Sequence, residues 1–205
     1  MKKIIATFAA LVLAFGYVSA QDLAEITEMY NSGAAAIAAG DKEGALKSFE
    51  QAYELASVLG ADGAEIADNC KKVIPDLNLS IAKGLVNATK YSEAIERLKT
   101  TISVAEKFAD ADILAEAKDI LPKVVMQNAG ALLNAKKYVE AAAAYKEVLD
   151  GDPTNGLAAL RMGLALNGAG KADEAKAALQ TAAENGQQTQ AYKQLTNIFL
   201  KEAAA

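Results

Sequence analysis

The chain of 205 residues contains no histidine, no tryptophan and a single cysteine. Without histidine the sequence lacks the commonest general base and metal ligand of enzymes. A GxSxG nucleophile motif, a Walker-type phosphate loop and the carboxylate spacing of an EF-hand are also missing. We therefore predict that the protein is not an enzyme, and we expect no catalytic residue, no bound cofactor and no metal site.

Positive charge is in short supply as well. The chain has 21 basic and 26 acidic residues, a net charge of −5, and its basic residues never form a block. A basic block is what attracts nucleic acid or an anionic lipid surface, so we expect neither as a partner. The sequence is instead rich in alanine, lysine, glutamate and leucine and has only three prolines, a composition that favours helix.

The N-terminus has the pattern of a secretory signal peptide. A basic start (MKK) precedes an apolar run over residues 4–15, and small residues (VSA) follow at 18–20. The apolar run is shorter than the roughly 20 residues that a membrane span requires, which makes an uncleaved anchor the less favoured alternative. We predict a signal peptide over residues 1–20 with cleavage near Ala20. The mature chain, 21–205, is then exported, periplasmic or secreted, without a membrane span.

Much of the mature chain consists of an internal repeat. The segments KYSEAIERLK (residues 90–99) and KYVEAAAAYK (137–146) share a register that also aligns Pro75 with Pro122. Weaker copies cover residues 31–56 and 161–186. In the second half of each copy a small residue is followed four positions later by a larger one, and usually by another small one after three more. These sets are Ala45, Phe49, Ala52; Ala94, Leu98, Thr101; Ala141, Tyr145, Val148; and Ala175, Leu179, Ala182.

Residues at these spacings share one face of a helix, where the small side chain lets a partner helix approach and the large one fills the groove beside it. In this the chain resembles the tetratricopeptide repeat (TPR) family, whose unit is a helix-turn-helix of about 34 residues. The first copy has Gly33, Ala45, Phe49 and Ala52 at the family's Gly, Ala, Phe and Ala positions. The remaining matches are Ala82, Ala94 and Leu98; Ala129, Ala141, Tyr145 and Pro153; and Gly163, Ala175, Leu179 and Ala182.

The resemblance implies an all-α, right-handed solenoid of about four helical hairpins with a C-terminal capping helix. The repeats would cover about 26–59, 60–108, 109–155 and 156–189, and the cap 190–203. The cap is expected to bury a stripe formed by Ala191, Leu195, Ile198 and Phe199 and to turn a polar face outward.

The chain departs from the family in the spacing of its repeats. No tryptophan occupies the early aromatic position, and extra residues precede the first helix of the second and third repeats. There an apolar stripe stays in phase through Pro75 and Pro122, which favours one long helix kinked at proline over a short helix that ends before it. The same register pairs Cys70 with the small residue Ala117, which favours buried packing over a redox role.

The family resemblance also implies that the first helix of each hairpin lines a concave, peptide-binding surface. There, lysine and arginine could pair with carboxylates, and amides could bind peptide backbone. For Asn87 and Asn134 the alternative is that they merely end helices. The chaperone-tail carboxylate clamp of the family is not expected, because Tyr30 and Ala34 occupy its lysine and asparagine positions. The candidate groove residues are Tyr30, Asn31, Lys83, Asn87, Met126, Gln127, Asn134, Arg161 and Asn167.

These features predict a protein–protein interaction module, an adaptor or scaffold of the bacterial cell envelope that binds an extended peptide or a helix of another protein. The alternative is a permanent structural subunit of an envelope assembly or secretion complex. Such a subunit should expose a contiguous apolar patch and purify with its partner, whereas a peptide receptor should be a monomer with a polar groove. Self-association through the convex face or Cys70 is a further option.

Overall fold

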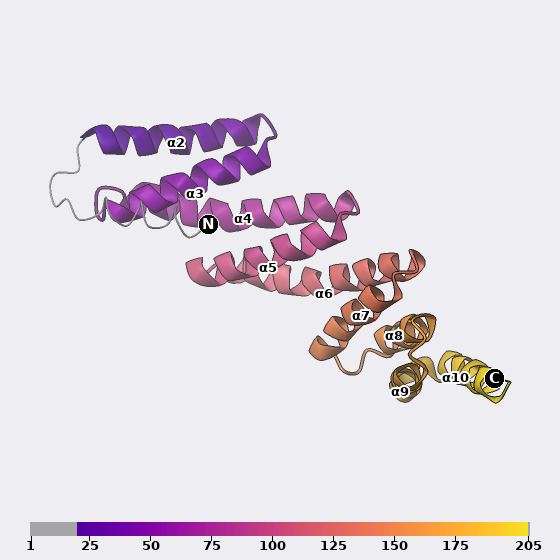
Figure 1. Cartoon of the computed structure of the whole chain (residues 1–205). Coiled ribbons are helices and arrows are strands. Elements are labelled where there is room, and N and C mark those ends of the chain that lie inside the picture. Colours follow the sequence, from indigo (N-terminus) through magenta and orange to yellow (C-terminus); the bar gives the residue numbers. More distant parts are fainter. Residues whose placement is uncertain (1–19, 205) are drawn as a thin grey trace, which may run out of the picture. The chain divides into compact units, whose positions relative to one another are not determined.

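The computed structural model describes residues 20–204, and these form helices joined by short turns, with no strand among them. The predicted signal peptide therefore lies outside the described residues except for Ala20, the first residue of α2. The helices in chain order are α2 (Ala20–Ala38), α3 (Lys42–Val58), α4 (Ala64–Asn87), α5 (Tyr91–Phe108), α6 (Ala111–Asn134), α7 (Tyr138–Gly151), α8 (Gly156–Gly168), α9 (Ala172–Ala182) and α10 (Gln188–Ala203) (Figure 1). The segment η1 (Ala183–Gln187) is a kink between α9 and α10, where Asn185 and Gly186 have non-helical backbone angles. The predicted all-α fold of helical hairpins is confirmed.

The chain divides into two compact units, one up to Leu77 and one from Asn78 onward, so the border falls inside α4. In unit 1, α2 packs against α3. Phe49 is buried between them and lies so close to Gly33 that a Cβ there would stand 2.9 Å from the ring. The glycine of the repeat pattern is thus needed for a close approach of the two helices. Asp41 starts α3, and its Oδ1 accepts a hydrogen bond of 2.9 Å from the Gly44 N–H.

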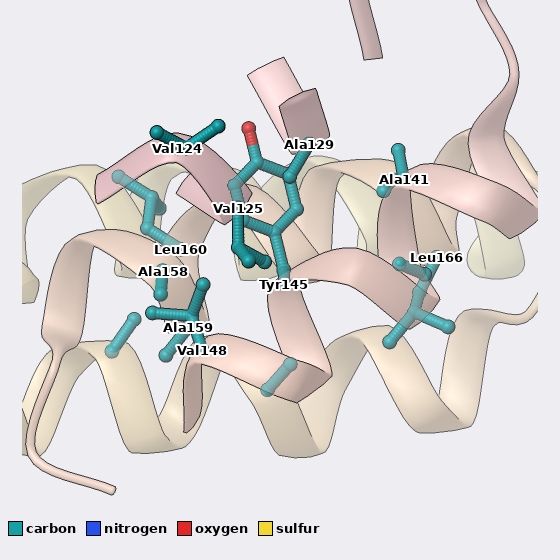
Figure 2. Packing of buried hydrophobic residues seen from close by; sticks show 14 of the residues in the cluster. Val124, Val125, Ala129, Ala141, Tyr145, Val148, Ala158, Ala159, Leu160 and Leu166 are labelled. Atoms are coloured by element: carbon teal, nitrogen blue, oxygen red, sulfur yellow. The ribbon is translucent and has the colours of Figure 1, made fainter. Parts of the chain in front are cut away.

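In unit 2, successive helices from α5 to α9 pack against one another in chain order. The small and large residues of the repeat pattern all lie in the buried core of the two units. Figure 2 shows part of this core in unit 2, with Tyr145 of α7 among side chains of α6, α7 and α8. Because such hairpins cannot bury their apolar faces alone, each helix of the unit covers its neighbour.

Both prolines of the repeat lie inside long helices. Pro75 is within α4 and Pro122 within α6, and each helix runs for 24 residues. The prediction of one long helix is confirmed, and the alternative of a helix that ends before proline is wrong. Each proline removes one backbone N–H from the helix, but the apolar stripe on both sides of it keeps a single buried face.

The hairpin turns share one backbone geometry. Gly40, Thr89, Lys136 and Gly170 follow the first helices with positive φ angles of 80°, 58°, 58° and 76°. The next N–H reaches back into the helix each time, as when Lys90 N donates to Leu85 O at 2.9 Å. This is the hydrogen-bonded left-handed ending that usually uses glycine, and two of the four turns form it without one.

The C-terminal helix α10 buries Ala191, Leu195 and Ile198 as predicted. The prediction for Phe199 is wrong, because its side chain is 54% exposed and its ring lies 5.4 Å from Lys176 Nζ. Tyr192, two turns of helix before Phe199 on the same side, and the adjacent Leu200 are exposed too. The outer face of α10 is therefore more apolar than the predicted polar cap.

Cys70 is fully buried, and this burial raises the pKa of its thiol to about 11. The prediction of a packing position is confirmed, since a protonated, inaccessible thiol is a poor nucleophile. None of the described helices is long and apolar enough to cross a membrane.

Candidate functional site

The predicted groove residues are distributed over both units. In unit 1, Tyr30 is partly buried, and its ring meets the ring of Phe49 edge to face, with centroids 5.2 Å apart. Part of the Tyr30 ring is therefore buried against α3 and is not available to a peptide. The neighbouring Asn31 is exposed and borders an open, shallow hollow along α2.

In unit 2, several predicted residues are engaged locally. Lys83 of α4 forms an ion pair of 2.7 Å with Glu116 of α6. Asn87 and Asn134 are exposed and are the last residues of α4 and α6, as the helix-end alternative supposed. The backbone carbonyl of Asn167 accepts a bond from Gly170 N in the turn after α8. Gln127 is exposed on α6.

The remaining two predicted residues, Met126 and Arg161, belong to a more developed site. Met126 lines a hollow of about 580 Å³ between the middle of α6, the end of α7 and the segment that leads into α8. Its floor is apolar and includes Leu121, Pro122, Val125 and Val148. The sequence predicts a concave surface along the first helices, and this hollow is a further feature that the sequence did not predict.

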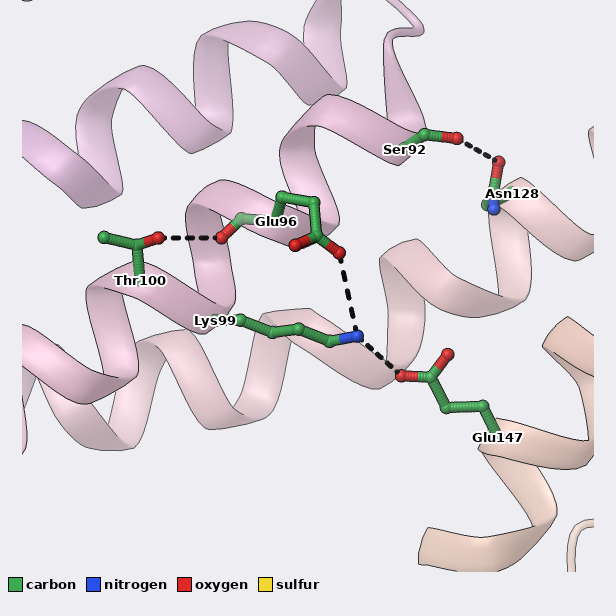
Figure 3. Close-up of polar contacts among 6 residues, drawn as sticks. All are labelled: Ser92, Glu96, Lys99, Thr100, Asn128 and Glu147. Carbon is green, nitrogen blue, oxygen red and sulfur yellow. Dashed lines mark hydrogen bonds and ion pairs between the residues drawn. The ribbon is translucent and has the colours of Figure 1, made fainter. Parts of the chain in front are cut away.

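The polar residues at the rim of the hollow already have partners within the protein. Glu147 forms an ion pair of 3.2 Å with Lys99, which also forms a longer ion pair of 3.9 Å with Glu96 of its own helix (Figure 3). Lys123 pairs with Asp119 at 2.7 Å. Asn155 caps α8 by accepting a bond of 3.0 Å from Ala158 N.

Asp152 completes this rim. Its Oδ1 accepts hydrogen bonds from the N–H and the hydroxyl of Thr154, at 3.1 and 2.7 Å. Each polar side chain at the rim thus forms a hydrogen bond or an ion pair within the protein, and the apolar floor has no such partner.

Arg161 of α8 lies near the hollow, on the side of α6 where Gly130 stands. A Cβ at Gly130 would be 3.8 Å from the Arg161 guanidinium and 3.7 Å from the Tyr145 hydroxyl, so three helices meet at this point. Arg161 is partly buried. Tyr145 is fully buried, and its hydroxyl has no hydrogen-bond partner among the described residues. Burial raises the pKa of the Tyr145 phenol, and the nearby charge of Arg161 opposes that rise.

The sequence explains why this arrangement occurs once. The residues equivalent to Tyr145 in the other hairpins are Phe49, Leu98 and Leu179, which carry no hydroxyl. The residues equivalent to Gly130, one position after the family's glycine position, are Ala34, Lys83 and Leu164. Only the third hairpin combines a tyrosine with a glycine over its hydroxyl.

The hollow and the Arg161 region form one strip along α6. Met126 and Gly130 are four residues apart on the same face of α6, and Tyr145 and Val148 are three apart on α7. Four helical residues span about 6 Å. We call this surface, made by Leu121, Val125, Met126, Gly130, Val148 and Arg161, the α6–α8 strip.

Met126 and Arg161 were predicted from the sequence as groove residues, whereas Tyr145 and the floor of the hollow were not. The signal for Tyr145 was present, because a hydroxyl at the large core position of a repeat needs a partner. Among the described residues, no group of three histidine, cysteine, aspartate or glutamate side chains could hold a metal ion.

Comparison with known proteins identifies the class of repeat. Residues 132–197, from the end of α6 into α10, match the sequence family described as tetratricopeptide repeat. This segment is a tetratricopeptide repeat segment, which confirms the family that the sequence resembles. No curated protein matches the chain.

Several solved structures are similar at low identity. "MamA 41-end from Desulfovibrio magneticus RS-1" is 16% identical with a TM-score of 0.41, covering 87% of this chain and 85% of that one. "TPR2AB-domain:pHSP90-complex of yeast Sti1" is 16% identical with a TM-score of 0.37, covering 87% and 84%. YrrB, titled "a TPR protein with an unusual peptide-binding site", is 18% identical with a TM-score of 0.36, covering 80% and 89%.

Proposed function

We propose that the protein is a protein–protein interaction module of the bacterial cell envelope, which holds a peptide or helix of another protein on the α6–α8 strip. The observation that carries the proposal is the strip itself: an apolar hollow of about 580 Å³ and a partly buried guanidinium beside it, on the first helices of two successive hairpins. Binding surfaces of this kind combine an apolar pocket with a few polar groups that fix orientation. The envelope location rests on the signal-peptide pattern of residues 1–20.

The described residues favour binding over catalysis at the strip. Two of its ionisable rim groups are held in ion pairs with residues outside the hollow, Glu147 with Lys99 at 3.2 Å and Lys123 with Asp119 at 2.7 Å. A general acid or base must instead be free to exchange a proton with a substrate. An apolar floor with a satisfied border is suited to receiving a side chain.

Affinity capture with cross-linking tests this proposal. Residues 21–205 would be used to capture proteins from envelope extract, beside a double variant, Met126→Ser with Arg161→Gln, and a control, Lys193→Gln, which removes a charge from the exposed face of α10. We expect one protein to be captured by the native chain and the control, to be lost with the double variant, and to cross-link to α6 or α8. Equal capture by all three chains would place the binding surface elsewhere and refute the proposal.

A second candidate function, a permanent subunit of an envelope assembly, is favoured by one observation. Three large apolar residues of α10, Tyr192, Phe199 and Leu200, are 53%, 54% and 64% exposed. Isolation of the native complex from the envelope under mild detergent, followed by light scattering, distinguishes the two. A stable complex that Leu200→Lys disrupts supports the subunit function, whereas a monomer supports the peptide receptor.

A further inference from the structure

We propose that the α6–α8 strip recognises two features of its partner at a fixed spacing: an apolar side chain in the hollow and a carboxylate at Arg161. This inference rests on the proposed function and adds to it the chemistry of the partner.

Arg161 is partly buried and has no carboxylate partner among the described residues, whereas the lysines of unit 2 without an ion pair, Lys136, Lys137, Lys193 and Lys201, are exposed. Lys83, Lys99 and Lys118 each pair with a glutamate of another helix, at 2.7, 3.2 and 2.9 Å. The only other arginine, Arg97, donates to Asn78 Oδ1 at 3.1 Å. No described carboxylate lies within ion-pair distance of Arg161, although its side chain is partly buried. A guanidinium held partly out of water, with free donors, is a preferred site for a carboxylate.

Tyr145 gives Arg161 a fixed position. Its hydroxyl is fully buried, makes no hydrogen bond of good geometry with any described residue, and lies beside the Arg161 guanidinium at the place where Gly130 lacks a side chain. A buried hydroxyl without a partner is costly to the fold. A carboxylate on the guanidinium would draw Arg161 toward α6, where the phenolic oxygen can accept one of its N–H groups. Tyr145 is thus a positioning residue for Arg161, and Gly130 leaves the approach open.

We expect an apolar occupant because the floor of the hollow is apolar and each polar side chain at its rim already has a partner within the protein. Glu147, Lys123, Asp152 and Asn155 are engaged by partners within the protein. The floor formed by Leu121, Val125, Met126 and Val148 is what remains to be covered. A volume of about 580 Å³ accommodates a leucine or phenylalanine side chain with its backbone, and burying such a side chain supplies the affinity.

The spacing of the two features predicts a sequence motif. Met126 and Gly130 are one turn of α6 apart, about 6 Å. Two residues of an extended peptide span about 6.6 Å, so the partner has an apolar residue with an acidic residue two positions away.

Nuclear magnetic resonance of the arginine side chains tests the inference directly. The native chain, residues 21–205, has two arginines, so Arg97 serves as an internal control for Arg161. The probes are end-blocked pentapeptides that carry leucine and, two residues later, glutamate. Matched peptides replace the glutamate by glutamine, replace the leucine by alanine, or end in a free carboxylate in place of the glutamate.

We expect the leucine–glutamate peptide to shift the Arg161 Nε–Hε signal with saturation and to leave Arg97 unchanged. Either replacement should weaken binding at least tenfold, the ratio that corresponds to one charge-assisted contact or one buried side chain. The free-carboxylate peptide distinguishes a C-terminal from a side-chain source. Tyr145→Phe should weaken the glutamate peptide severalfold and leave the glutamine peptide unaffected, which loss of packing alone does not predict.

Gly130→Asp provides a test that needs no peptide. A carboxylate built on the Cβ position 3.8 Å from the guanidinium should shift the Arg161 signal by itself and block the glutamate peptide. If the glutamine peptide binds as tightly as the glutamate peptide, the carboxylate part of the inference is wrong while the proposed function stands. If no peptide moves the Arg161 signal, the whole motif is wrong. The proposed function fails separately, when capture from envelope extract ignores the strip variants.

Discussion

Three glycines inside helices of unit 2 differ in what an added methyl group would meet. Around Gly84 of α4 nothing lies within 4 Å, and at Gly130 of α6 the nearest atom is 3.7 Å away. At Gly163 of α8 a Cβ would stand 2.7 Å from Leu179 Cγ and 3.3 Å from Ala175 O, against a leucine that is fully buried. The same substitution to alanine therefore tests packing at three degrees of closeness.

The expected magnitudes follow from two opposing effects. Alanine in place of glycine inside a helix stabilises by about 0.5–1 kcal/mol, and we expect this full gain for Gly84→Ala and Gly130→Ala. Overpacking a well-filled core costs about 1–3 kcal/mol, so Gly163→Ala should lose its gain and destabilise by up to about 2 kcal/mol.

Urea unfolding followed by circular dichroism measures the differences. With a slope of about 1–3 kcal/mol per molar urea, the midpoints of Gly84→Ala and Gly163→Ala should differ by roughly 0.5 M or more. A Gly163→Ala protein as stable as Gly84→Ala would show that α8 and α9 do not approach each other as described, and the explanation of the repeat's glycine would be wrong.

Three further perturbations have definite expected outcomes. Replacing Ala94 or Ala141 by leucine should lower the free energy of unfolding by about 1–3 kcal/mol, because both side chains are fully buried at helix contacts; an unchanged melting temperature for both would show that the hairpin register is wrong. Thr89→Gly should raise the free energy of unfolding by about 1 kcal/mol, because a β-branched residue adopts the positive φ of 58° at a cost; urea midpoints decide this too. The Cys70 thiol has a folded pKa of about 11, above its ordinary value of 9.0. Burying the protonated thiol therefore costs no free energy of folding below pH 9, and the free energy of unfolding should fall as the pH rises from 9 toward 11. A thiol reagent at pH 8 should label Cys70 only when the protein unfolds.

The fold was predictable because the repeat encodes its contacts by position. Ala45 with Phe49 and Ala175 with Leu179 share a spacing that fixes one helix face, and all four are buried. The continuation of α6 through Pro122 was predictable for the same reason, since burying an unbroken apolar stripe stabilises the helix more than the loss of one backbone hydrogen bond destabilises it. Phe199 was mispredicted because it lies one residue past Ile198, at the edge of the stripe, where periodicity alone does not decide burial.

The candidate site was only half predictable. Met126 and Arg161 were identified because the family resemblance places them on first helices. The hollow depends on where the end of α7 and the segment before Asn155 lie beside α6, and no local pattern encodes that distance. Tyr145 was assigned to the core, correctly, but the fate of its hydroxyl depends on Gly130, a residue from another helix.

Selection of short random peptides on the immobilised native chain tests most directly whether the α6–α8 strip recognises protein segments. Counter-selection on Arg161→Gln would identify the peptides that depend on the strip, and Lys193→Gln would control for the lost charge. The structure predicts enrichment of peptides with an apolar residue and an acidic residue two positions apart, and loss of these on Arg161→Gln alone. Enrichment that is the same on all three chains, or none at all, would contradict a binding surface on α6 to α8.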